Sequence, residues 1–142
     1  WLRVLEEGLI GTLARWGLSG ERVPGRTGVW VEGEKIASIG VAVRRWVGYH
    51  GFALNVSPAL DGFELIHPCG LHGVRMTSMA ARLGARGPSL EQAREAATSE
   101  LADLLGYGRV VPVLATELRH LVDTAGAAGT SNHPSVAGTG PA

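Results

Sequence analysis

The middle of the chain consists of short strand-forming stretches separated by glycine-rich turns. Valine, isoleucine and aromatic residues are concentrated in four of them, at residues 28–31, 35–40, 41–47 and 52–56. The sequence Glu-Gly-Glu at residues 32–34 resembles a tight turn that joins the first two stretches as a hairpin. We therefore expect this region to form a β-sheet.

Helical patterns flank the expected sheet on both sides. Apolar residues recur every three or four positions over residues 2–16, as in an amphipathic helix. Further along, Ser89 and Gln92 have the spacing of a helix capping box, and an apolar stripe follows them. A last helix is expected around residues 116–122. The order of helix, strands and then helices favours an α+β fold over a doubly wound parallel sheet.

The length of 142 residues and the apolar fraction of 45% suit one domain with a modest core. We place this domain at residues 1–123. Residues 124–142 have almost nothing to bury, so we expect this tail to be disordered.

Charge and cysteine content restrict the partners and the compartment. Thirteen basic residues balance thirteen acidic ones, so no overall field would attract nucleic acid or an anionic membrane. A single cysteine cannot form an internal disulfide, and no apolar run approaches the roughly 20 residues that cross a bilayer. We therefore expect a cytoplasmic protein with no nucleic-acid or membrane partner.

Cys69, the only cysteine, lies between two residues that break regular structure. Pro68 and Gly70 place it on a turn, where reactive side chains are often found. An isolated cysteine is also often a small buried hydrophobe, so a nucleophile and a packing residue both remain open.

A metal site at this turn is a weaker alternative. Its candidate ligands would be His67, Cys69, His72 and His50. The pattern H-x-C-x-x-H lacks the paired C-x-x-C spacing of structural zinc sites, so we expect no metal.

A cysteine nucleophile needs a neighbour that takes its proton, because a free thiol titrates only at about pH 8.5. Lys35 is the only lysine among thirteen basic residues, and the others are arginines. Arginine does not exchange protons near neutral pH, whereas a partly buried lysine can. Lys35 is therefore a candidate acid and base, although a plain charge on an edge strand is the simpler alternative.

Four motifs occur in a fixed order along the chain: GVWV at residues 28–31, KIASIG at 35–40, HGFALN at 50–55 and PCG at 68–70. Together they resemble the lipoyl(octanoyl) transferase family, which moves an octanoyl group from acyl carrier protein to a lysine of a lipoyl domain. The resemblance runs from about Leu2 to Leu121. It implies a mixed β-sheet flanked by helices, similar to the catalytic domain of biotin and lipoate protein ligases.

The resemblance also implies roles for individual residues. Cys69 matches the nucleophile that accepts the acyl group, and Lys35 matches its acid/base partner. The acyl-binding backbone segments match Ser38, Ile39, Gly40, Gly51, Phe52 and Ala53. The implied partners are octanoyl-acyl carrier protein and the lipoyl domains of 2-oxoacid dehydrogenase complexes and of the glycine cleavage H protein. No cofactor is expected, because the thioester donor is already activated and the chain has no G-x-x-x-x-G-K-[ST] phosphate loop.

One departure from the family pattern concerns the N-terminus. Family members normally carry a preceding portion with an arginine-glycine-glycine element and a histidine-glycine loop, and neither occurs here. We therefore expect residues 1–123 to be the C-terminal part of a catalytic domain, poorly stable and inactive alone. The alternatives are a lipoate or biotin ligase that uses ATP, an octanoyl amidotransferase, and an inactive remnant that only binds its partners.

Overall fold

The structure, a computed structural model, describes residues 1–45, 47–60, 74–114 and 116–119. The chain divides into two units, residues 1–110 and 111–142. In the second unit, residues 116–119 are helical, and the amide of Leu118 donates to the carbonyl oxygen of Leu114 at 3.0 Å. This confirms the expected last helix as far as residue 119. The expected disordered tail lies outside the described residues.

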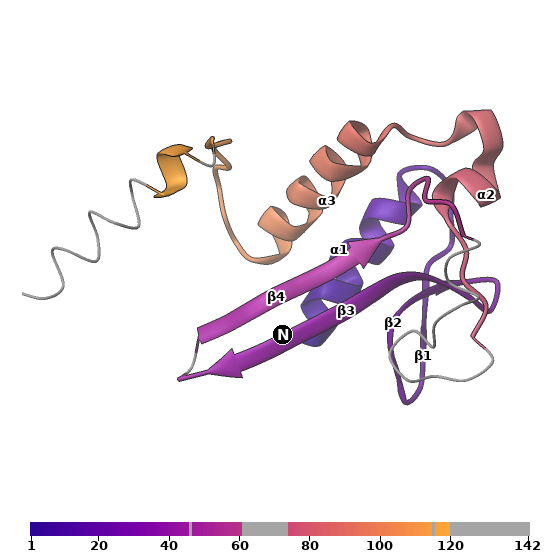
Figure 1. The fold of residues 1–142 in the computed structure, drawn as a ribbon, viewed down its shortest axis with the longest axis horizontal. Coiled ribbons are helices and arrows are strands. Elements are labelled where there is room, and N and C mark those ends of the chain that lie inside the picture. The colour runs from indigo at the N-terminus through magenta and orange to yellow at the C-terminus, as the bar shows by residue number, and fades with distance from the viewer. Residues whose placement is uncertain (46, 61–73, 115, 120–142) are drawn as a thin grey trace, which may run out of the picture. The chain divides into compact units, whose positions relative to one another are not determined.

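The first unit contains a four-stranded sheet (Figure 1). Its strands are β1 (Glu21–Val23), β2 (Arg26–Val31), β3 (Glu34–Arg44) and β4 (Val47–Leu54), and they follow one another in the order β1-β2-β3-β4. All three pairings between these strands are antiparallel. One isolated bridge, between Lys35 and Met76, is parallel, so both kinds of pairing occur in this region.

The expected strands are present with changed limits. Residues 35–40 and 41–47, which we treated as two stretches, form a single long strand up to Arg44. The hairpin turn before it is confirmed: Glu32 and Gly33 have φ angles of 50° and 78°, the left-handed conformation that such turns require. Strand β4 begins before the predicted residues 52–56 and ends at Leu54. The sequence analysis missed β1, because the surrounding glycine and proline indicated only a turn.

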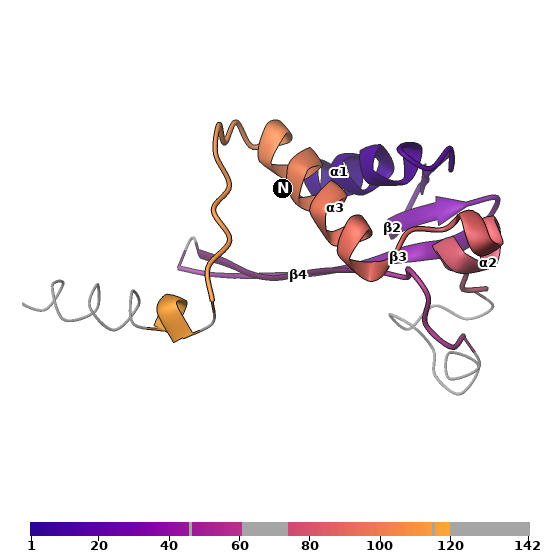
Figure 2. The same cartoon turned by 90° about the horizontal axis from the view of Figure 1, so that it is seen from above.

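Two long helices cover one face of the sheet. Helix α1 spans Leu2–Ala14 and helix α3 spans Leu90–Leu104, and Figure 2 shows both on the same side of the strands. A short helix, α2 (Met79–Leu83), continues into a 3-10 turn, η3 (Gly84–Arg86). The predicted capping box is present at the start of α3: the Ser89 hydroxyl accepts from the Gln92 amide, and the Gln92 side chain accepts from the Ser89 amide. The α+β prediction is confirmed.

The main hydrophobic core lies between the helices and the sheet. Leu5, Leu9 and Leu13 project from α1 at the predicted spacing, and they join Val29 of β2 and Ile39 of β3 in one buried cluster. Helix α1 approaches α3 closely at Gly8, where an added Cβ would lie 2.6 Å from a methyl carbon of Leu101. These contacts fix which face of the sheet is covered by helices.

A buried carboxylate ties α1 to the first two strands. Glu6 is 3% exposed, and its carboxylate pairs with Arg3 at 2.8 Å and with Arg22 of β1 at 3.1 Å. The other carboxylate oxygen accepts from the amide of Gly28 at 3.4 Å. A hydrogen bond to Glu7 raises the pKa of the Arg22 guanidinium, and Glu6 adds to the effect. The paired charges satisfy a carboxylate that burial alone would destabilise.

Candidate functional site

A β-bulge determines the direction of the Lys35 side chain. In the pairing of β2 with β3, Trp30 lies opposite Lys35, while its neighbour Val29 lies opposite Ala37. Two consecutive residues of β2 therefore face three residues of β3, and Ile36 is the extra one. Ile36 and Ala37 both belong to the core cluster, so the usual alternation of side chains is interrupted between them.

The bulge separates two faces of the sheet. Val29 belongs to the face covered by helices, because its side chain and those of Ile10 and Leu13 surround the same point next to Gly20. Trp30 follows Val29 and therefore points to the opposite face. Lys35 is the cross-strand partner of Trp30 and shares that face, which we call the lysine face. If β3 alternated regularly from Ala37 back through Ile36, Lys35 would share the helix-covered face with Ala37.

The environment of Lys35 is closed and contains an aromatic ring. The residue is 0% exposed, and its ammonium nitrogen lies 5.6 Å from the centre of the Trp30 ring. Gly28 makes room for the lysine side chain: an added Cβ would lie 2.7 Å from its Cε and 3.3 Å from its Nζ. A buried amine next to a ring face fits a functional lysine better than the edge-strand alternative.

The two predicted acyl-binding segments are paired with each other. Their cross-strand partners are Ser38 with Ala53, Ile39 with Phe52, and Gly40 with Gly51. Segments eleven to fifteen residues apart in the sequence are thus brought together by a single antiparallel ladder.

Alternation assigns these three pairs to different faces. Phe52 lines a cavity with residues of α3, and its partner Ile39 belongs to the core, so this pair points to the helix-covered face. The other two pairs therefore point to the lysine face. An acyl chain on that face would meet only the backbone of Ile39 and Phe52.

The glycine pair on the lysine face leaves free space in the described structure. A Cβ built at Gly40 or at Gly51 has no heavy atom of the described chain within 4 Å, apart from its own neighbours in sequence. Small side chains flank the pair, at Ser38 and Ala53. Such a surface lets an extended apolar chain lie directly against the backbone.

The segment that follows residue 73 is hydrogen-bonded to the backbone of Lys35. The amide of Lys35 donates to the carbonyl oxygen of Arg75 at 2.9 Å, and the amide of Thr77 donates to the carbonyl oxygen of Lys35 at 2.9 Å. The chain that precedes residue 61 is held nearby, because the amide of Asn55 donates to the carbonyl oxygen of Ile36 at 2.9 Å. Cys69 and the neighbouring histidines 67 and 72 lie between these anchors, outside the described residues.

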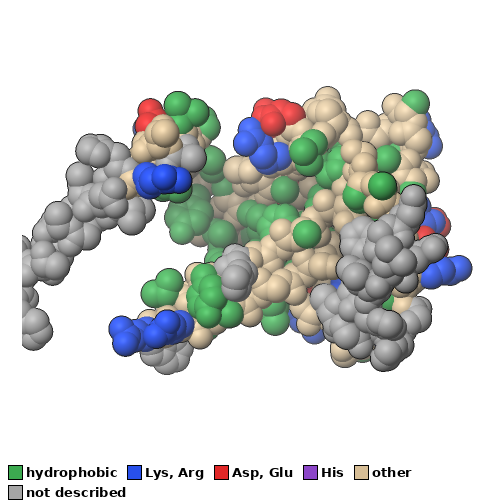
Figure 3. All heavy atoms as spheres, in the orientation of Figure 1, with side chains coloured by type: hydrophobic (Ala, Val, Ile, Leu, Met, Phe, Trp, Pro, Cys, Tyr) green, Lys and Arg blue, Asp and Glu red, His purple; other side chains and the backbone are tan. Residues whose placement is uncertain are grey.

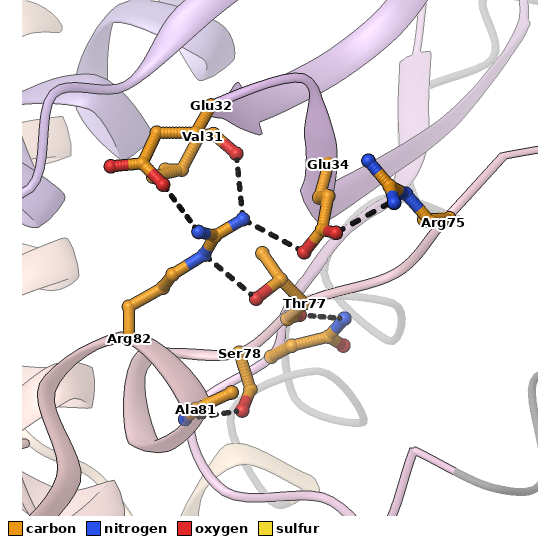
Figure 4. A network of polar contacts seen from close by, with 9 residues as sticks. Val31, Glu32, Glu34, Arg75, Thr77, Ser78, Ala81 and Arg82 are labelled. Carbon is orange, nitrogen blue, oxygen red and sulfur yellow. Dashed lines mark hydrogen bonds and ion pairs between the residues drawn. The ribbon is translucent and has the colours of Figure 1, made fainter.

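A polar network strengthens the anchor of the segment that follows residue 73 (Figure 4). The guanidinium of Arg82 in α2 pairs with Glu34 at 2.7 Å and also with Glu32 in the β2–β3 turn. Its Nε donates to the hydroxyl of Thr77 at 3.1 Å, and its Nη2 donates to the carbonyl oxygen of Val31 at 3.2 Å. One side chain therefore joins the hairpin that carries Lys35 to the segment that returns from residue 73.

A separate apolar cavity lies on the helix-covered face, between β4 and α3. Its volume is about 320 Å³, and it is lined by Phe52, Leu54 and Val56 on one side and by residues of α3 such as Ala93 and Leu101 on the other. Figure 3 shows hydrophobic side chains gathered between these two elements. Because the sheet separates this cavity from Lys35, it is distinct from the lysine face.

The described part of the chain has neither a metal-binding cluster nor a helix that could span a membrane. No group of three or more His, Cys, Asp or Glu side chains is arranged there to hold a metal ion. Within residues 1–45, 47–60, 74–114 and 116–119, no helix combines the length and the apolar character that crossing a bilayer needs.

Lys35 was predicted from the sequence, but the residues that shape its surroundings were not. Gly28 and Trp30 were part of the GVWV motif, and Arg82 was not considered. Gly28 and Trp30 are two residues apart on one strand and therefore share a face. This spacing could have indicated that both lie beside the residue opposite Trp30, which is Lys35. The bulge that aligns them with Lys35 has no such signal in the sequence.

The chain is similar in sequence to curated octanoyltransferases. An octanoyltransferase of Synechococcus sp. (strain JA-2-3B'a(2-13)) is 65% identical over 71 residues, which are 50% of this chain and 27% of that protein. An octanoyltransferase of Geobacter sulfurreducens (strain ATCC 51573 / DSM 12127 / PCA) is 46% identical over 104 residues, 73% of this chain and 44% of that protein. The chain thus spans less than half the length of these curated relatives.

One solved structure has a fold similar to that of this chain. A T. acidophilum protein described as a candidate lipoate protein ligase has a TM-score of 0.60 and 18% identity, over 87% of this chain and 53% of that one. At this identity the likeness concerns the fold alone. Residues 2–102 match the family described as the lipoyl protein ligase A/B catalytic domain, which is more than half of the chain. The chain therefore belongs to the lipoyl protein ligase A/B catalytic domain family.

Proposed function

We propose that this chain forms part of an enzyme that transfers an octanoyl group from acyl carrier protein to a lysine of a lipoyl domain, through a thioester on Cys69. The observation that carries this proposal is the lysine face, where the buried Lys35 and the glycine pair Gly40 and Gly51 lie on one side of the same two strands. A proton-transfer group beside a surface for an apolar chain is what acyl transfer to a thiol requires.

In the first step, the amine of Lys35 accepts the proton of the Cys69 thiol. The thiolate attacks the carbonyl carbon of octanoyl-acyl carrier protein, the bond from that carbon to the carrier sulfur breaks, and the carrier sulfur takes a proton from the Lys35 ammonium. Arg75, six residues after Cys69, is hydrogen-bonded to Lys35. Six residues span at most about 20 Å, so this anchor supports a thiol in the region of Lys35.

In the second step, the amine of a lysine from the lipoyl domain attacks the carbonyl carbon of the acyl-enzyme. An amide bond forms, the bond to the Cys69 sulfur breaks, and the proton released by the attacking amine passes through Lys35 to the thiolate. The enzyme returns to its starting state without ATP, because the energy comes from the thioester.

The octanoyl chain lies, in this proposal, against the backbone between Ser38 and Gly40 on β3 and between Gly51 and Ala53 on β4. The free space above the glycine pair supports this position. Each buried CH₂ group of the tail contributes about 0.8 kcal/mol, so the depth of the site selects the chain length.

The acceptors are the lipoyl domains of 2-oxoacid dehydrogenase complexes and of the glycine cleavage H protein, and the reaction takes place in the cytoplasm. No cofactor takes part. Residues 1–123 form the C-terminal part of the catalytic domain, and residues 124–142 are a disordered tail outside it.

A chimeric enzyme tests the proposal, because the chain covers only part of its relatives. Residues 1–142 replace the matched region of the Geobacter sulfurreducens octanoyltransferase, and the product is mixed with octanoyl-acyl carrier protein and analysed by peptide mass spectrometry. We expect an octanoyl group on Cys69, released by addition of a lipoyl domain. Cys69→Ala should abolish the adduct, and Lys35→Arg, which keeps the charge but does not exchange protons, should slow its formation strongly.

Two results would refute the assignment. An octanoyl group on a residue other than Cys69 would exclude the proposed nucleophile. Transfer that requires ATP and proceeds from free octanoate would indicate a ligase instead.

A further inference from the structure

We propose that Trp30 is a positioning residue for Lys35: its indole ring holds the lysine amine in place and stabilises the ammonium that forms when the amine accepts a proton. The part of this proposal that concerns the reaction rests on the proposed function, in which Lys35 transfers the protons. The contact between ring and amine can be tested without it.

The contact follows from the register of the sheet. Trp30 and Lys35 are direct cross-strand partners, and the ammonium nitrogen lies 5.6 Å from the ring centre. This is within the distance of about 6 Å at which the negative face of an aromatic ring attracts a cation. The Arg26 guanidinium carbon also lies 5.6 Å from the centre of the same ring.

Burial makes the contact specific. Trp30 is 2% exposed and Lys35 is 0% exposed, so neither side chain is free to turn into solvent. Gly28, on the same face, leaves just enough space for the lysine, since a Cβ there would approach Cε to 2.7 Å. The lysine side chain is thus held between strand β2 and the ring.

The indole N–H indicates that the ring itself matters at this position. Within the described part of the chain, Nε1 of Trp30 is buried and has no hydrogen-bond partner. Burying such a donor lowers stability, and a purely apolar side chain would avoid that cost. The π-face next to Lys35 is the property of tryptophan that leucine or methionine would lack.

The attraction is selective for the charged state of the lysine. A ring face attracts the ammonium and is almost indifferent to the neutral amine. In the proposed reaction Lys35 holds the proton taken from the thiol while the thiolate attacks. The ring would therefore stabilise the acyl-transfer intermediate more than the resting enzyme, which raises the rate without tightening substrate binding.

The sole lysine makes the contact directly measurable. A chain labelled with ¹³C at the lysine ε position gives one lysine signal, because Lys35 is the only lysine of the 142 residues. We expect its ε protons to be shifted upfield by the ring, and to return toward the value of the urea-unfolded chain in Trp30→Leu. The matched control Trp16→Phe, which changes a ring packed against the core, should leave the signal unchanged.

A measurement on the unchanged chain covers the case in which Trp30→Leu does not fold. The chain is deuterated except at lysine and tryptophan. We expect a nuclear Overhauser effect between the ε protons of Lys35 and the protons of an indole ring. The effect should be absent in Trp30→Phe, in which the phenylalanine is deuterated. A folded chain without this effect, or an unchanged lysine signal in folded Trp30→Leu, would overturn the proposal.

The kinetic test uses the chimeric enzyme. We expect Trp30→Leu to lower kcat by about 10-fold with little change in KM, and Trp30→Phe to restore most of the rate because phenylalanine keeps a ring face. A lysine contact without any change in kcat would leave Trp30 a packing residue and overturn its positioning role. A lysine contact in a chimera without transferase activity would instead count against the proposed function and leave the contact intact.

Discussion

Replacement of Gly28 by alanine tests how tightly the lysine face is built. The added Cβ would lie 2.5 Å from the carbonyl oxygen of Ala37 and 2.7 Å from Cε of Lys35. Real Cβ atoms do not approach other atoms so closely, so β2 and β3 must separate or Lys35 must move. Gly28 also has a φ angle of 128°, a conformation that side chains rarely adopt.

Both effects have a known size. A backbone conformation of this kind costs about 1–3 kcal/mol in a residue other than glycine, and crowding in a packed region costs about 1–3 kcal/mol. We therefore expect Gly28→Ala to lower the free energy of unfolding by about 2–6 kcal/mol. Gly25→Ala is the matched control: Gly25 has a φ angle of 76° and no heavy atom within 4 Å of the added Cβ, so it reports backbone strain without crowding.

Urea denaturation followed by circular dichroism measures both variants. The crowding component should lower the midpoint of Gly28→Ala below that of Gly25→Ala by about 1 M, for a slope of about 1–3 kcal/mol per molar urea. Part of this difference should disappear when Lys35 is also replaced by alanine, because one of the two close contacts is then removed. Equal midpoints for the two glycine variants would show that the geometry around Lys35 is wrong.

Three further predictions concern other parts of the structure. Gly40→Val should leave the melting temperature nearly unchanged, because its side chain enters free space, but should shift the chimeric enzyme toward acyl chains shorter than octanoyl in a competition assay. Arg82→Met should lower stability by about 1–3 kcal/mol in thermal melts, since it leaves partly buried polar groups unpaired, whereas Arg94→Met at an exposed ion pair should change it by less than about 1 kcal/mol. Ser89→Ala should lower stability by about 1 kcal/mol through loss of the capping box, and Ser89→Asp should restore most of it.

Much of the fold could be predicted from local patterns. The leucine spacing of α1, the capping box of α3 and the Glu-Gly-Glu hairpin each depend on residues close together in the sequence, and the structure contains all three. Strand β1 and helix α2 were missed. Strand β1 is only three residues long, and α2 has five, so neither is long enough to show a period.

The sequence could predict which residues belong to the candidate site but not how they are arranged. Lys35 was indicated by being the only lysine, and the two acyl-binding segments by their resemblance to a family. That Ser38 lies opposite Ala53, and that Ile39 and Phe52 turn their side chains away from the lysine face, follow from a register that only the folded chain fixes. The role of Cys69 stays a prediction, since it lies outside the described residues.

The bulge at Ile36 has a consequence for how this protein can change over evolutionary time. Deleting the codon of Ile36 would remove the bulge and leave Lys35 next to Ala37, so the lysine would stay opposite Trp30 on the lysine face. Regular alternation with Ile36 still in place would instead turn the lysine toward the leucines of α1. A gain or loss of one residue at the exposed end of the β3–β4 hairpin would also leave the pairing of Trp30 with Lys35 unchanged. Related sequences can therefore differ in length at that hairpin or at the bulge, while the turn between the GVWV motif and the lysine keeps its length, because a change there would shift the pairing of Trp30 with Lys35.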